Sequence, residues 1–167
     1  MISLVRRIFA VLSAFGLAAS VVAYVGSYIG MSMESMFPWS FVLHVGVFIL
    51  LLPMYGIDYS VVKDRTFFWK GFAQGMPRSV VPGIRVLGLF FAVHFVLFLI
   101  RSHAAAPEIK NGEYVLNKHG QIVKVLTQSE YISLKGAELR LFATGWIFFY
   151  FVPTMYWWFP RLRQWAA

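Results

Sequence analysis

A run of 15 uncharged residues lies between Arg85 and Arg101, and it constrains the fold more than any other stretch of the chain. In a helix, at about 1.5 Å per residue, the two arginines stand roughly 24 Å apart along the axis. Their side chains can extend outwards, so the segment nearly matches a hydrocarbon core about 30 Å thick. The stretch 82–102 therefore predicts a transmembrane helix with one polar residue, His94, between the two arginines.

Three further uncharged stretches predict spans at about 8–30, 38–56 and 141–160. The composition agrees, because 59% of the residues are hydrophobic and only 13% are charged, against about 25% charged in a typical soluble domain. We therefore expect residues 1–167 to form a single membrane domain: an all-α integral membrane protein with four transmembrane helices in an antiparallel bundle. The first stretch also resembles a secretory signal, but it exceeds the apolar region of about 7–15 residues in a cleaved signal.

The connections between the spans differ in character. Residues 57–81 mix basic and aromatic side chains, a pattern that predicts a cytoplasmic amphipathic loop in the headgroup plane and not a nucleic-acid site. Residues 103–140 form the longest polar segment, which we expect to be an extracytoplasmic insertion between the third and fourth helices.

Within that insertion, the patterns at 114–117 and 122–126, joined by a turn at Gly120, predict a small β-hairpin. Thr127 and Glu130 then fit a capping box, in which each side chain accepts a hydrogen bond from a free backbone N–H. A helix should therefore begin near Gln128 and continue through Arg140 into the last span.

The distribution of basic residues sets the expected topology. With the N-terminus in the cytoplasm, nine basic residues lie inside and six outside, and those inside are concentrated near the ends of the spans. The sequence thus predicts a multi-pass protein of a bacterial cell inner membrane with both termini cytoplasmic. The inner set is Arg6, Arg7, Lys63, Arg65, Lys70, Arg78, Arg85, Arg161 and Arg163, and the outer set is Arg101, Lys110, Lys118, Lys124, Lys135 and Arg140.

Six small residues recur along the first span with spacings of three and four. They are Ser13, Gly16, Ser20, Ala23, Ser27 and Gly30. This spacing keeps them on one side of the helix, where small side chains permit close approach of a second helix. The stripe predicts packing against another helix of the same bundle or, alternatively, homodimerisation.

Two histidines, His44 and His94, fall at similar depths, about 9–10 Å below the outer surface, in spans expected to be antiparallel neighbours. Such a pair could ligate one haem b iron from opposite sides. The competing interpretation is structural, because a histidine within a membrane commonly forms hydrogen bonds to a neighbouring helix.

The sequence contains no catalytic constellation. It has no cysteine and no acidic residue within a predicted span, and it lacks phosphate-binding and metalloprotease motifs. We therefore expect no catalytic residues, no metal and no cofactor. The protein should act by binding, with the lipid bilayer and a membrane-protein partner or a second copy as its contacts, as a subunit of a membrane complex or an immunity-like protector. The alternatives are a bis-histidine haem-b electron carrier using His44 and His94, and an oligomeric channel or carrier.

Overall fold

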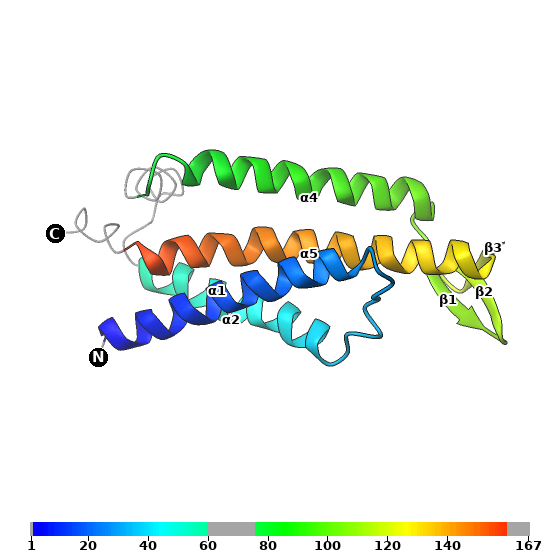
Figure 1. The fold of residues 1–167 in the computed structure, drawn as a ribbon, viewed down its shortest axis with the longest axis horizontal. Helices are drawn as coiled ribbons and strands as arrows, with labels where there is room; N and C mark the ends of the chain where they lie inside the picture. Colours follow the sequence, from blue (N-terminus) through cyan, green and yellow to red (C-terminus); the bar gives the residue numbers. More distant parts are fainter. Residues whose placement is uncertain (1, 60–75, 160–167) are drawn as a thin grey trace.

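The computed structural model describes residues 2–59 and 76–159, with side chains at 4–54 and 76–159. This part of the chain is mostly helical and carries one small sheet (Figure 1). Its elements are α1 (Ile2–Gly26), α2 (Trp39–Tyr59), α4 (Val80–Ser102), β1 (Ala106–Lys110), β2 (Glu113–Lys118), β3 (Gln121–Val125) and α5 (Gln128–Trp158). The four helices alternate in direction along the long axis of the molecule, and the sheet lies at one end (Figure 1).

Helix α5 is the element on which the other three helices pack. Of its residues, 15 are buried, and 11 of these lie between Ala143 and Trp157, where buried residues occur on every side of the helix. Helices α1, α2 and α4 each contact α5, and α5 lies between α4 and α2 (Figure 1). The positions of the other helices are therefore set mainly by their contacts with this one.

The contact between α1 and α5 depends on small residues. Five members of the small-residue stripe, Ser13, Gly16, Ser20, Ala23 and Ser27, are buried, whereas Gly30 is exposed in the turn after α1. A Cβ at Gly16 would overlap the Tyr150 ring, and a Cβ at Gly136 would lie 2.9 Å from the backbone oxygen of Ser27. The stripe thus lies against a helix of its own chain.

Aromatic side chains complete the contacts of α5 with its other neighbours. Tyr150 Oη donates to the carbonyl oxygen of Leu43 at 2.8 Å, which fixes α2 alongside α5. Towards α4, the ring of Phe91 faces Gly145 of α5, while Phe148 and Phe151 of α5 face Gly88 and Gly83 of α4. Each ring thus lies opposite a residue without a side chain, as expected in a densely packed interface.

Two helical segments, Leu4–Gly26 of α1 and Val80–Ser102 of α4, are long and apolar enough to cross a membrane. In α2, a shorter apolar stretch covers Trp39–Met54. The helix continues through Pro53 to Tyr59, beyond the predicted boundary, and α1 ends four residues earlier than predicted. The predicted interfacial loop at 57–81 falls largely outside the described residues.

The insertion after α4 is a three-stranded antiparallel sheet in the order β1–β2–β3, where the sequence had indicated only a two-stranded hairpin. Strands β2 and β3 correspond to the two strands that the sequence predicts at 114–117 and 122–126. The additional strand, β1, pairs Ala106 with Asn117 and Lys110 with Glu113. Its sequence, Ala-Pro-Glu-Ile-Lys, lacks the β-branched alternation by which strands are recognised, so the first strand was missed.

The junction of the sheet with α5 is as predicted. Thr127 Oγ1 accepts a hydrogen bond from the N–H of Glu130, and the Glu130 carboxylate accepts one from the N–H of Thr127, so the capping box is confirmed. Lys124 donates to the same carboxylate at 2.7 Å, and together these bonds lower the pKa of Glu130 to about 2. The sheet is thereby attached to the first turn of a helix that continues unbroken for 31 residues.

We expect Gly16→Ala to lower the free energy of unfolding by about 1–3 kcal/mol, the usual cost of overpacking a filled core. The Tyr150 ring cannot move aside easily, because it is buried and its hydroxyl is held by Leu43. Gly83→Ala is the matched control: its Cβ would lie 3.5 Å from Phe151, an ordinary contact, and alanine gains about 1 kcal/mol in helix propensity. Thermal denaturation in detergent measures both variants, and shifts of the same sign would contradict this packing.

Candidate functional site

Polar and charged side chains gather where the sheet-proximal ends of α1, α4 and α5 meet the loop after α1. We call this group the sheet-end cluster. Its members are Tyr24, Tyr28, Glu34, His94, Lys135, Glu138 and Arg140. They come from three helices and one loop, and most of them contact a member from another element.

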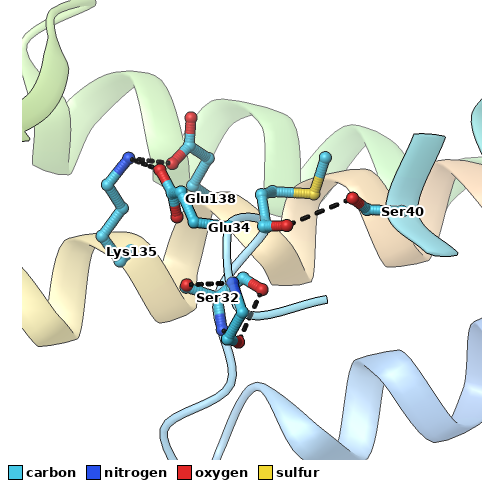
Figure 2. A network of polar contacts seen from close by, with 7 residues as sticks. Ser32, Glu34, Ser40, Lys135 and Glu138 are labelled. Carbon is cyan, nitrogen blue, oxygen red and sulfur yellow. Dashed lines mark hydrogen bonds and ion pairs between the residues drawn. The ribbon is translucent and has the colours of Figure 1, made fainter. Parts of the chain in front are cut away.

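Lys135 is the buried centre of the first half of the cluster. Its residue exposure is 9%, and its ammonium donates to Glu34 at 2.5 Å and to Glu138 at 3.1 Å (Figure 2). Glu34 comes from the loop between α1 and α2, whereas Glu138 lies one turn along α5 from the lysine. The two carboxylates compensate the charge that burial would otherwise make costly, and they fix the loop on α5.

The loop itself has internal order. Ser32 and Ser35 bond reciprocally, each backbone N–H donating to the hydroxyl of the other at 2.9 and 3.2 Å. Ser40, at the start of α2, donates to the carbonyl oxygen of Met33 at 3.1 Å (Figure 2). These bonds hold Glu34 in a position from which it reaches Lys135.

The ion pair shifts the pKa values of Glu34 and Lys135 in the directions that favour their charged forms. Partial burial raises the pKa of Glu34, but the hydrogen bond and charge of Lys135, together with hydrogen bonds from the backbone and from Ser32, outweigh burial, so the pKa lies below its ordinary value. For Lys135, burial lowers the pKa, and the bonds to Glu34 and Glu138 more than reverse this effect. Both groups are therefore held in their charged forms at neutral pH.

Arg140 occupies the second half of the cluster. Its guanidinium lies 4.7 Å from the centre of the Tyr28 ring, and Nη1 donates to the backbone oxygen of Ser27 at 3.3 Å. Among the described residues Arg140 forms no ion pair with a carboxylate, since Glu34 and Glu138 are both engaged by Lys135. A partly buried positive charge is thus held by a ring face and one carbonyl alone.

His94 is connected to this half of the cluster through two tyrosines. Its Nδ1 lies 3.0 Å from the Phe90 carbonyl oxygen, which can only accept, so Nδ1 carries a proton and donates. Its Nε2 lies 3.4 Å from the Tyr24 hydroxyl, which is 3.0 Å from the Tyr28 hydroxyl. In the neutral ring Nε2 is the acceptor, so the chain of hydrogen bonds is directed from Tyr28 to Tyr24 to His94.

His44 has different partners. On α2, its Nδ1 accepts a hydrogen bond from the indole N–H of Trp146 at 3.4 Å, and its ring meets Phe48 and Phe142 edge-on. His94 contacts α1, whereas His44 contacts α5, which lies between α2 and α4 (Figure 1). The contacts thus do not bring the two rings together. Their shared ligation of a haem stays a prediction.

Among the described residues, no group of three or more histidine or acidic side chains could hold a metal ion. The sheet-end cluster likewise pairs no serine or threonine with a base, so its chemistry is that of hydrogen bonding and charge. The chain matches no family model, no curated protein and no solved structure.

The sequence offered almost no signal for this cluster. Lys135 and Glu34 are 101 positions apart, and Arg140 and Ser27 are 113 apart, so no short motif contains either pair. One indirect signal existed. Glu34 is the only acidic residue between the first two predicted spans.

We expect Glu34→Gln to destabilise the protein at neutral pH and to lose its effect in acid. Because the folded pKa of Glu34 lies below its ordinary value of 4.5, the stabilisation is present above that value and is lost as the pH falls through the folded pKa. Melting temperatures of both proteins, measured in detergent from pH 7 to pH 3, should therefore converge at low pH. The matched control is Glu113→Gln at the exposed start of β2, and a similar converging profile for that variant would refute the assignment.

Proposed function

We propose that this chain is a four-span protein of a bacterial inner membrane that binds an extracytoplasmic or membrane partner through its sheet. The observation that carries the proposal is β3, all five residues of which are exposed, although Ile122, Val123 and Val125 are apolar. A strand with one unpaired edge can accept a further strand from another chain. The protein would then act as an accessory subunit or an immunity-like protector, without catalysis.

The arrangement of the helices supports four spans. Large apolar side chains are exposed along α1, α2 and α4, including Phe15, Phe41 and Leu89, as lipid-facing helices require. Helix α5 is uncharged from Leu141 to its end at Trp158, and its neighbours bury most of that stretch, so it needs less apolar character than they do. The sheet lies at the end of the helices opposite the start of α1 and the end of α5 (Figure 1), which supports a location on the other side of the membrane from those helix ends.

The proposed topology can be tested cleanly because the chain contains no cysteine. In spheroplasts, an impermeant maleimide should label Gln121→Cys, in the exposed strand β3, without permeabilisation. It should label Ser79→Cys, an exposed position before α4, only after the membrane is opened. Labelling of both variants in closed spheroplasts, or of Ser79→Cys alone, would overturn the proposed orientation.

The proposed interface can be tested with a photo-crosslinking amino acid at Val123 in living cells. Val123 is 51% exposed in β3, and Leu97, 45% exposed on α4, is the matched control on the surface proposed to face lipid. We expect a discrete adduct from position 123 and none from position 97. Val125→Lys should remove the adduct, because a charge on an edge strand opposes further pairing. An adduct that persists in this variant, or that forms equally at position 97, would argue against β3 as the interface.

A further inference from the structure

We propose that Arg140 and the hydroxyl of Tyr28, beside Tyr24, form a binding site for the phosphate of an anionic lipid in the outer leaflet. This proposal rests on the proposed membrane-spanning arrangement, which sets the depth of the site. It does not depend on the partner of β3.

The first argument is charge. Lys135 has two carboxylates, while Arg140, one and a half turns further along α5, has none within the described part of the chain. A partly buried cation that lacks a counter-ion is costly, and an anion from the surroundings can supply the missing charge. Arg140 lies at the boundary between the polar part of α5 and its uncharged part. In a bilayer, the abundant anions nearest to this boundary are lipid phosphates.

The second argument is geometry. One guanidinium nitrogen, Nη1, is anchored to the Ser27 oxygen, and the plane is supported by the Tyr28 ring. The other donors of the guanidinium, Nε and Nη2, form no hydrogen bond to a described residue. Arginine binds phosphate through two parallel N–H donors, so an anchored guanidinium with two remaining donor nitrogens is oriented before the ligand arrives.

The space for this guanidinium is provided by Gly136. A Cβ at that position would lie 3.4 Å from Nη1 of Arg140, closer than most side-chain contacts, and 2.9 Å from the Ser27 oxygen that anchors it. Because Gly136, one turn before Arg140, carries no side chain, the guanidinium of Arg140 can lie over the Tyr28 ring. Close packing of α1 on α5 and the orientation of Arg140 have the same cause.

The third argument is the neighbouring hydroxyls. Tyr28 is 62% exposed, and its hydroxyl continues the chain through Tyr24 to Nε2 of His94. A phosphate oxygen on Arg140 could accept the proton that the Tyr28 hydroxyl otherwise donates to Tyr24, while the Tyr24 hydroxyl continues to donate to His94. Val21, one turn before Tyr24 on α1, is 45% exposed and offers an apolar contact for an acyl chain.

Native mass spectrometry of the purified full-length protein in a non-ionic detergent tests the site. We expect the wild-type protein to retain one phosphatidylglycerol at concentrations where phosphatidylcholine is not retained. Arg140→Gln should weaken this binding about tenfold or more, because a charge-assisted hydrogen bond contributes more than a neutral one. Arg101→Gln, at an exposed arginine in the last turn of α4, is the matched control and should leave the affinity unchanged.

Two further variants separate binding from folding. Tyr28→Phe keeps the ring below the guanidinium and removes only the hydroxyl, so we expect a loss of a few-fold in affinity with an unchanged melting temperature. Arg140→Lys keeps the charge and removes the second donor nitrogen, and it should bind more weakly than the wild type.

Three results would overturn the proposal: equal retention of the two lipids, equal effects of Arg140→Gln and Arg101→Gln, or displacement of the lipid by millimolar inorganic phosphate, which would indicate a site for the free ion. The crosslink at Val123 is measured in the Arg140→Gln variant as well. If the crosslink at Val123 persists but neither the wild type nor any variant distinguishes phosphatidylglycerol from phosphatidylcholine, only the lipid site is refuted. Selective lipid retention without any crosslink would instead leave the lipid site and remove the proposed partner interface.

Discussion

The close approach of α1 to α5 is the constraint on which the rest of the structure depends. Where Gly16 and Gly136 lie, a single added methyl group would meet the Tyr150 ring or the Ser27 backbone. The absence of side chains there lets Tyr150 reach across to Leu43 and hold α2, and lets Arg140 reach Ser27. Three helices are thus joined through contacts that only small residues permit.

The buried hydroxyls along the same interface show how such packing avoids unsatisfied polar groups. Ser13 and Ser20 each donate to a carbonyl oxygen of their own helix, at Phe9 and Gly16, at 2.5 and 2.6 Å. Thr154 does the same on α5, with the Tyr150 carbonyl at 2.7 Å. Their polarity is satisfied locally, so these residues act at the interface through their size.

Much of the local structure could be predicted from the sequence, because it depends on neighbouring residues. The capping box at Thr127 needs only positions three apart, and the helix of Arg85–Arg101 needs only its uncharged run. The strand β1 could not be predicted, because it forms by pairing with β2 and its own residues carry no strand pattern. The position of each histidine along its helix could be predicted, but the helix that it faces could not: His94 contacts Tyr24 of α1, and His44 contacts Trp146 of α5. Neighbour relations in a bundle arise from the fit of whole helices, which no short spacing encodes.

The continuity of α5 has a mechanical consequence. Its 31 residues make a rod of about 46 Å that begins at the sheet and ends beside the first turns of α1, where Arg6 donates to the Trp157 carbonyl oxygen. Because no loop interrupts this rod, a tilt of one degree imposed at the sheet displaces the far end by roughly 0.8 Å, given that length. Pro153, which lacks a backbone N–H, lies one turn before Trp157 and is the point along the rod where the helical hydrogen bonding is weakest. A force applied at the sheet is therefore transmitted along α5 to the opposite end of the molecule. The helix bends most easily at Pro153, close to that opposite end.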